Sequence, residues 1–360
     1  MLPDLEGASV AALVPALLGG GDRAWLPAAV RDARAVVLFV LDGLGWRSLR
    51  EHRERMPTLD AMEGGPITTV VPSTTSTALT SIATGLVPAR HGVLGYRMVV
   101  RGEVLNVLRW SVPDGRRPPD PFDVQRHPAF LGRDVPVVTK SEFRDSGFTR
   151  AHMRGARFHG WSSTAVLVEH VARLVGAGER FVYAYYPGVD SVAHEFGLRD
   201  GFYARELALA DRLVAELLDV LPEDAALLVT SDHGQVHLDE DDWRELPELE
   251  PLVERMAGDG RFRYLHARPG AARELREAAE EVVGRLAWVR SRAEVLDEGW
   301  IGVGATGSVP GRLGDVVLAS SGPTAFVDPA LRVETRLRSG HGSLTADEML
   351  VPLLGARGRR

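Results

Sequence analysis

The sequence predicts an α/β fold in which helices cover an open, largely parallel β-sheet. Three short apolar runs, at residues 35–41, 181–186 and 225–230, are continuous and carry β-branched or aromatic residues, which is typical of strands buried on both faces. Residues 164–175 and 202–221 place apolar side chains at three- and four-residue spacing, which indicates amphipathic helices. Strands that alternate with helices along a chain favour a parallel sheet.

The length and composition are those of one globular domain with insertions. The chain has 360 residues, of which 45% are hydrophobic and 25% are charged, so enough apolar material is present for a large core. We therefore expect a single domain over residues 1–360. Residues 97–157, rich in Pro, Arg and Asp, are expected to form an insertion or lid, and residues 239–333, with a charged helix near 271–286, a partial cap.

Charge and cysteine content exclude several classes of protein. The formal net charge is −7 and no long basic run occurs, so the electrostatic footprint of a nucleic-acid duplex binder is missing. The chain has no cysteine, so any metal must be held by His, Asp, Glu or hydroxyl oxygen. Residues 7–21 are apolar but follow Asp4 and Glu6, which indicates a short helix and not a signal peptide. No apolar run reaches the length of about 18 residues that spans a membrane, so we expect a cytoplasmic protein with no membrane partner.

Potential metal ligands follow each of the three predicted strands almost at once. Asp42 follows the first strand, Asp190 and His194 follow the second, and Asp232 and His233 follow the third. Ligands of open α/β sheets bind beyond the carboxyl ends of the strands, so these side chains are expected to converge. The four-residue spacing of Asp190 and His194 places both on one face of a helical turn. Aspartate also caps helices and forms turns, which explains any one of these motifs but not readily all three.

Two further motifs offer a ligand and a nucleophile. His341 lies between two glycines, which let the backbone approach a ligand, although such a loop is equally typical of an exposed turn. Residues 73–77 are all Ser or Thr and lead into a helix predicted over residues 75–83. The amino end of a helix favours a phosphate or an oxyanion, because its N–H groups are free and its dipole is positive there. Most of these hydroxyls are expected to cap the helix, and at most one to act as a nucleophile.

Taken in order, these motifs resemble the signature of the nucleotide pyrophosphatase/phosphodiesterase branch of the alkaline phosphatase superfamily. An Asp after the first strand, PSTTSTALTSIATGLVPARHG, DSVAH, SDHG and GHG carry the resemblance over almost the whole chain. It implies an alkaline-phosphatase-like fold with two divalent metal ions. The implied ligands are Asp190, His194 and His341 for one zinc, and Asp42, Thr75, Asp232 and His233 for the other. Imidazole and carboxylate ligands without sulfur suit Zn²⁺, and Mn²⁺ is also compatible.

The resemblance also implies a mechanism and substrate contacts. Thr75 would attack phosphorus to give a phospho-threonine intermediate, which water then hydrolyses. Backbone N–H groups from Ser76 onward would hold a non-bridging oxygen. Lys140 and Arg144 lie where members of the family place substrate contacts, although Lys and Arg are more often solvated at the surface. His91 belongs to the same signature and is expected to be structural.

The sequence therefore predicts a metal-dependent hydrolase of phosphoric esters or phosphoanhydrides, resembling phosphodiesterases and nucleotide pyrophosphatases. Its expected partner is a small anionic phosphoester, with a nucleotide as one candidate, and its oligomeric state is left open. A phosphomonoesterase, phosphonate hydrolase or phosphomutase would use the same ligands, whereas a binding protein without catalysis would be expected to have lost one of them. No Lys or Arg occurs between residues 65 and 88, which favours the single charge of a diester over a monoester.

Overall fold

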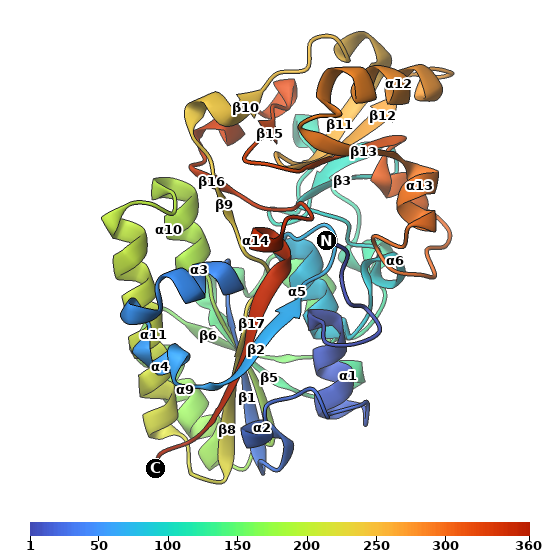
Figure 1. Ribbon diagram of the computed structural model, residues 1–360. Helices are drawn as coiled ribbons and strands as arrows, with labels where there is room; N and C mark the ends of the chain where they lie inside the picture. The colour runs from blue at the N-terminus through green and yellow to red at the C-terminus, as the bar shows by residue number, and fades with distance from the viewer.

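The computed structural model describes residues 1–360, and its central feature is a seven-stranded sheet (Figure 1). The strands are β1 (Ala35–Leu41), β2 (Glu63–Thr68), β5 (Pro136–Lys140), β6 (Arg157–Trp161), β7 (Phe181–Tyr186), β8 (Ala225–Thr230) and β17 (Leu350–Arg357). Their order is β2-β17-β8-β1-β7-β5-β6. β1 pairs in parallel with both β7 and β8, and β17 alone runs antiparallel to its neighbours. The predicted α/β fold is confirmed, and the three predicted strands have their predicted bounds.

Helices flank this sheet on both sides. They are α1 (Leu13–Leu18), α2 (Ala28–Arg31), α3 (Trp46–Glu51), α4 (Pro57–Asp60), α5 (Thr75–Thr84), α6 (Pro88–His91), α7 (Pro121–Val124), α8 (Gly147–His152), α9 (Thr164–Gly176), α10 (Gly188–Phe196), α11 (Gly201–Val220) and α14 (Ala346–Met349). The bounds of α5, α9 and α11 agree with the sequence-based predictions to within one residue at each end. The apolar N-terminal stretch forms a short 3₁₀ turn followed by α1. No helix combines the length and the apolar character needed to cross a bilayer.

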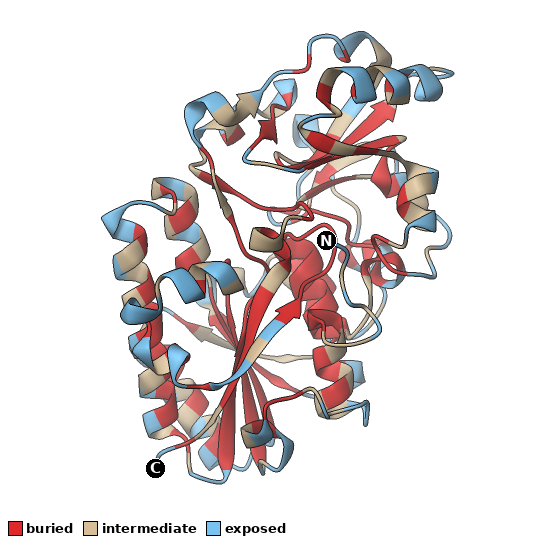
Figure 2. Cartoon of the chain, viewed as in Figure 1, coloured by how far each residue is buried: buried red, intermediate tan, exposed pale blue.

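Two separate hydrophobic clusters cover the two faces of the sheet. Every residue of β1 is buried, and successive side chains of a strand point to opposite faces. Val36 and Leu38 accordingly pack into the cluster that contains α1 and α5, while Val37 and Phe39 pack into the one that contains α9 and α11. Figure 2 shows the resulting buried sheet between two layers of helices whose outer sides are exposed. A strand buried on both faces is continuously apolar, and for this reason β1 could be predicted from its sequence.

A smaller antiparallel sheet lies apart from the central one (Figure 1). Its strands are β11 (Val253–Asp259), β12 (Phe262–Ala267), β13 (Ala287–Ser291) and β14 (Val316–Ser320), in the order β11-β12-β14-β13. α12 (Ala272–Val283) is the predicted charged helix, and its apolar side shares a small hydrophobic cluster with this sheet. α13 (Arg292–Asp297) follows β13. The sheet falls within the segment expected to form a partial cap, residues 239–333.

The segment expected to form an insertion or lid, residues 97–157, contributes both to a separate hairpin and to the central sheet. Its first part holds the hairpin of β3 (Arg97–Val100) and β4 (Glu103–Asn106). Further along, β5 lies inside the central sheet between β7 and β6. Two-stranded pairings join β9 (Val236–His237) to β16 (Ser339–Gly340) and β10 (Trp243–Arg244) to β15 (Ala325–Phe326). The division of the chain into one domain, a lid and a cap stays a prediction.

Candidate active site

Five of the predicted ligands come from the carboxyl ends of three neighbouring strands. β8, β1 and β7 lie side by side and run parallel, so the segments that follow them emerge at the same edge of the sheet. Asp42 directly follows β1, and Asp232 and His233 follow β8. Asp190 and His194 lie on α10, which begins two residues after β7 ends. The short connections leave these side chains little freedom to lie anywhere else.

The first group of potential ligands is Asp190, His194 and His341. Asp190 Oδ1 lies 3.4 Å from His194 Nε2 and 3.9 Å from His341 Nε2, and one donor atom from each residue lies within 4.8 Å of the others. The four-residue spacing on α10 brings Asp190 and His194 to one side of the helix, as expected. His341 reaches them from the far end of the chain, directly after β16.

The second group lies beside the first. His233 Nε2 is 3.5 Å from Asp42 Oδ1 and 3.5 Å from Asp232 Oδ2. Asp42, His233 and Asp190 each offer an atom within 4.8 Å of the others, so Asp190 is common to both groups. Thr75 Oγ1 lies 3.1 Å from His233 Nε2. All seven predicted ligands are therefore close together, and the His233 and His341 rings stack with centroids 3.7 Å apart.

The three histidines are oriented in the same way. Each Nδ1 lies 3.0 to 3.1 Å from a backbone carbonyl oxygen, and the carbonyls belong to Ser339 for His194, Gly234 for His233 and Ser73 for His341. A carbonyl oxygen only accepts, so Nδ1 carries the proton and Nε2 keeps the lone pair of a neutral imidazole. In each ring Nε2 is the nitrogen that faces the aspartates. Histidines that bind metals are held in this manner.

Three carboxylate oxygens at the same place have no hydrogen-bond partner. They are Asp42 Oδ1, Asp190 Oδ1 and Asp232 Oδ2, all shielded from solvent, and each is the atom that faces a histidine Nε2. A buried acceptor without a partner is costly. Lone-pair nitrogens and unpartnered carboxylate oxygens around a common centre need cations, so these residues fit two divalent metal ions.

The acid–base properties of the cluster agree with that conclusion. Burial raises the pKa of Asp42 well above its usual range, and the neighbouring Asp232 and Asp190 raise it further. Burial lowers the pKa of His341 well below its ordinary value, and His233 and His194 lower it further. His341 is therefore neutral, as a metal ligand must be. Arg261 acts electrostatically on His341 but is paired with Glu348, so it does little to offset the charge of the crowded carboxylates.

Thr75 is the first residue of α5 and is held against the His341 segment. No side chain caps the amino end of α5, so the first N–H groups of the helix are available to an anion. Ser73 and Gly342 form an antiparallel bridge, and Ser73 Oγ donates to the Ser343 carbonyl at 2.7 Å. The backbone that positions Thr75 is thereby joined to the backbone that positions His341. Ser76 is fully buried, and its Oγ has no hydrogen-bond partner.

Two cavities flank Thr75. One, of about 240 Å³, is mostly apolar and is lined by residues that include Leu79, Phe143, Phe148 and Tyr185. The other, of about 190 Å³, lies between Thr75 and the smaller sheet and includes Tyr96, Trp243, Asp259 and Arg261 among its lining residues. Arg261 pairs with the buried Glu348 through two contacts of 2.8 Å. Neither cavity holds an unpaired Lys or Arg.

Lys140 and Arg144 line neither of these cavities. Lys140 Nζ pairs with Glu142 at 2.5 Å, and the Arg144 guanidinium lies over the ring of Phe158, 4.5 Å from its centroid. The structure therefore does not bring them to Thr75. His91 is buried away from the ligand cluster, where its Nε2 lies 2.8 Å from Ser81 Oγ.

Tyr185 was not predicted from the sequence, yet its hydroxyl donates to Asp42 Oδ2. Asp232 is likewise held by the backbone N–H groups of Gly43, at 3.1 Å, and of its neighbour His233, at 3.0 Å. Tyr185 lies at the carboxyl end of the predicted strand 181–186, and in the structure this strand is adjacent to β1, which precedes Asp42. A tyrosine at that position was the one feature of the sequence that could have indicated the contact. Strand order, which the sequence did not reveal, was needed to use that feature.

Comparison with known proteins gives a consistent assignment. The chain matches the family model for type I phosphodiesterase/nucleotide pyrophosphatase over residues 36–342, whereas a comparison with curated protein sequences gave no significant match. Murine ectonucleotide pyrophosphatase/phosphodiesterase 5 superimposes with a TM-score of 0.68 at 14% identity, over 90% of this chain and 88% of that chain. An inactive variant of that protein in complex with AMP gives 0.67 at 14% identity, over 89% and 87%.

A second kind of solved structure is similar to the same extent. Phosphonoacetate hydrolase from Sinorhizobium meliloti, in complex with phosphonoformate, superimposes with a TM-score of 0.66 at 20% identity, over 91% of both chains. At these identities the structural matches show a shared fold. The family match covers most of the chain, including every strand that precedes a ligand motif. The chain belongs to the type I phosphodiesterase/nucleotide pyrophosphatase family of the alkaline phosphatase superfamily, a family of metal-dependent phosphoester hydrolases.

Proposed function

We propose that this protein is a two-zinc phosphodiesterase or nucleotide pyrophosphatase that acts through a phospho-threonine at Thr75. One observation carries the proposal. Three lone-pair nitrogens and three unpartnered carboxylate oxygens converge beside the Thr75 hydroxyl, which itself lies at an uncapped helix amino end. Metal ligands, a nucleophile and an anion-binding backbone are the three parts that phosphoryl transfer requires.

The ligand types support zinc, with manganese as the alternative. Asp190, His194 and His341 would hold one ion, and the other would be held by Asp42, Asp232 and His233 together with Thr75. Asp190 lies within reach of both positions. Bound divalent ions would neutralise the phosphate charge and lower the pKa of the nucleophilic hydroxyl. Mixed imidazole and carboxylate donors without sulfur are the ligands that Zn²⁺ accepts in catalytic sites.

The residues of the chain divide the reaction into two displacements. Thr75 Oγ1 loses its proton and attacks phosphorus, and the leaving group departs on the opposite side and takes up a proton as the free alcohol or phosphate. Water then attacks the phospho-threonine, and Thr75 Oγ1 leaves and regains its proton. In both displacements the free backbone N–H groups at the start of α5, from Ser76 onward, hold a non-bridging oxygen whose charge increases in the transition state. His233 Nε2 lies 3.1 Å from Thr75 Oγ1, so the two atoms are placed to hold the same ion.

The two cavities beside Thr75 support a diester or a nucleotide α-phosphate as the substrate. A monoester or a substrate with a further carboxylate brings an additional negative charge, which proteins commonly meet with Arg or Lys. The mostly apolar cavity has no Lys or Arg in its lining, and the other has only Arg261, which Glu348 neutralises. A related structure contains AMP, which supports a nucleotide as the group in one of these cavities.

A substrate panel on metal-saturated protein tests this proposal. Elemental analysis is expected to give two equivalents of zinc per chain. The value of kcat/KM is expected to be higher for a nucleotide p-nitrophenyl ester or bis(p-nitrophenyl) phosphate than for p-nitrophenyl phosphate. An advantage of about tenfold for the monoester, or about 1.4 kcal/mol in transition-state binding, would overturn the diester assignment. One equivalent of metal or none would overturn the two-metal centre.

A further inference from the structure

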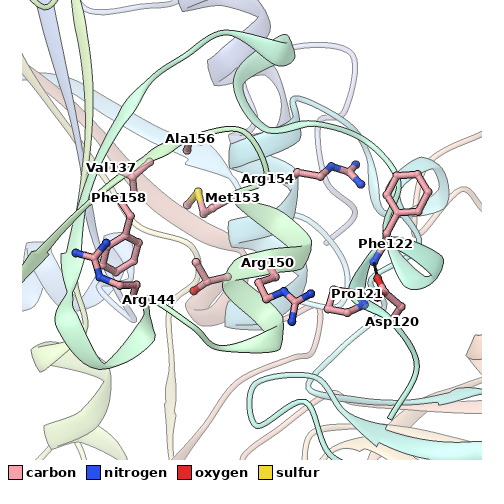
Figure 3. Close-up of a pocket in the computed structure, with 11 residues that line it drawn as sticks. Asp120, Pro121, Phe122, Val137, Arg144, Arg150, Met153, Arg154, Ala156 and Phe158 are labelled. Atoms are coloured by element: carbon pink, nitrogen blue, oxygen red, sulfur yellow. Dashed lines mark hydrogen bonds between the residues drawn. The ribbon is translucent and has the colours of Figure 1, made fainter. Parts of the chain in front are cut away.

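A further cavity, of about 370 Å³, is lined in part by α8 (Figure 3). Its lining comes from α7, the turn before α8, α8 itself, and the strands β5 and β6. The volume is within the range of roughly 300–1,000 Å³ that is usual for small-molecule sites. None of the predicted metal ligands lines it, so the Thr75 chemistry does not account for it.

Three arginines line this cavity against one acid. Arg144 and Phe158 lie on one side in Figure 3, Arg154 and Asp120 lie on the other, and Arg150 lies between them. The Asp120 carboxylate accepts from a backbone N–H at 2.9 Å to cap α7. The side chains of Arg144 and Arg150 have no ion pair and no hydrogen bond among the described residues. The cavity therefore has a net positive charge that no group of the protein offsets.

The arginines are held beside aromatic rings and above an apolar floor. Arg144 Cζ lies 4.5 Å from the Phe158 ring centroid, and Arg154 Cζ lies 4.6 Å from that of Phe122. These contacts orient both guanidinium planes, and Arg154 also donates to the Arg126 carbonyl, whereas the N–H edge of Arg144 stays free. Phe122 is 54% exposed at the rim, and Val137 and Met153 form part of the floor. A bare inorganic anion would leave the apolar surface unfilled.

We propose that this cavity binds a small anion that carries an aromatic ring, with a phosphate, phosphonate or carboxylate as its charged group. A guanidinium matches the geometry of such an oxyanion and can bind it through two N–H groups, and that of Arg150 lies in the middle of the cavity in Figure 3. The ring of the ligand packs on the apolar floor. This site is distinct from the one at Thr75 and does not depend on the reaction proposed there.

α8 and the turn that follows it form the wall between the two sites. Thr149 and Met153 line both cavities, Phe148 and His152 line the Thr75 side, and Arg150 lies on the other. A ligand that pulls on Arg150 therefore acts on the same helix that shapes the Thr75 cavity. Occupancy of the second site is expected to change the KM of the enzyme for its substrate.

Calorimetric titration of chelated, metal-free protein with phenylphosphonate tests the proposal. Phenylphosphonate is expected to bind at one site, while inorganic phosphate and benzyl alcohol each bind at least tenfold more weakly, because each lacks one half of the ligand. Arg150→Gln is expected to weaken binding at least tenfold, and Arg144→Gln, which changes a side chain at one side of the cavity, is expected to weaken it less. Both side chains are exposed and unpaired, so their loss leaves the fold intact, which a thermal melt verifies. Arg133→Gln, an exposed arginine outside the cavity, is expected to change nothing.

Two further outcomes separate this site from the Thr75 site. Asp190→Asn is expected to leave phenylphosphonate binding unchanged in metal-free protein. Loss of binding in that variant would place the ligand at the Thr75 site and overturn the proposal. Unchanged affinity in both arginine variants, or no binding to the wild-type protein, would also overturn it. Equal affinity for inorganic phosphate would show that an aromatic ring contributes nothing to binding, and would overturn the proposed class of ligand.

Discussion

Single contacts to backbone carbonyls decide which histidine nitrogens face the proposed metal site. The Ser73 carbonyl accepts from His341 Nδ1 at 3.1 Å, and the same residue leads into Thr75. The Ser339 carbonyl accepts from His194 Nδ1 at 3.0 Å. Each contact fixes a ring plane as well as a tautomer, so the three lone pairs are oriented before any metal binds. Such preorganisation lowers the cost of assembling a metal site.

Replacement of Thr75 is expected to remove activity without unfolding the protein. Loss of a covalent nucleophile removes the main reaction path, so Thr75→Ala should lower kcat by about a thousandfold or more, whereas a substitution at a helix amino end costs about 1 kcal/mol of stability. Thr75→Ser, which keeps a hydroxyl, should retain part of the activity. Steady-state kinetics and thermal melts check both results.

Thr74→Ala is the matched control, because the Thr74 side chain makes no capping hydrogen bond to α5. It should leave kcat close to that of the wild type. If Thr74→Ala inactivated the enzyme and Thr75→Ala did not, the nucleophile would be the wrong residue of the hydroxyl cluster.

Tyr185→Phe is expected to weaken metal binding. It removes the hydroxyl that donates to Asp42 Oδ2, and loss of a hydrogen bond to a ligand typically lowers metal affinity by about 10- to 100-fold. Titration of chelated protein with zinc should show the loss at one of two sites. Tyr183→Phe is the control, since the buried Tyr183 hydroxyl has no partner. Equal losses in both variants would mean that packing, and not the hydrogen bond, supports Asp42.

The loops that follow the central strands make close backbone contacts with one another. Gly234 follows His233 at the end of β8. A Cβ there would lie 1.9 Å from the Asp347 carbonyl oxygen and 2.9 Å from Gly45 Cα, both of which are backbone atoms. Glycine is therefore required by close approach, and the SDHG motif reflects this packing as well as its ligands.

Gly234→Ala is expected to separate these loops. The backbone must shift to accept the methyl group, which should lower the free energy of unfolding by about 1–3 kcal/mol and reduce zinc content. Denaturant titration and elemental analysis measure the two effects. Gly201→Ala adds a methyl group in open space at the start of α11 and should not destabilise the protein. Wild-type stability and zinc content in Gly234→Ala would contradict this account.

The strands that escaped prediction have sequences that do not look like strands. β2 reads EGGPIT and β17 contains Pro352, and proline and glycine normally argue against a strand inside a sheet. In the structure Pro352 pairs with Pro66 of the edge strand β2, while the pairing of β17 with β8 begins one residue later, at Leu353. Two prolines that donate no hydrogen bond therefore face each other, which local sequence cannot reveal.

In the molecule as a whole, the proposed metal site joins segments from all parts of the chain. Asp42, Thr75, Asp190, Asp232 and His341 lie on separate segments, and Asp190 belongs to both ligand groups. Ions bound there would connect the central sheet to the segment that follows the smaller sheet. Metal binding and global stability should therefore be coupled.

Chelation of metal is expected to lower the melting temperature. A ligand that binds only the folded state stabilises it by about 2.7 kcal/mol when its concentration is 100 times Kd. Thermal melts with and without added zinc measure the effect, and Asp190→Asn, which alters both ligand groups, should lose most of it. Identical melting of the wild-type protein with zinc and with chelator would contradict the coupling.

Local sequence patterns were sufficient to predict the fold class, strands β1, β7 and β8, and the residues that lie close together beyond the ends of those strands. Continuous apolar runs and motifs that directly follow strands depend on neighbours in sequence. Contacts between distant segments set everything else: His341 and Ser73 are 268 positions apart, and Tyr185 and Asp42 are 143 apart. The histidine tautomers, the sharing of Asp190, and the position of Arg144 in a separate cavity follow from strand order and packing. Those properties belong to no single segment, because each is produced by two or more segments that meet only in the folded chain.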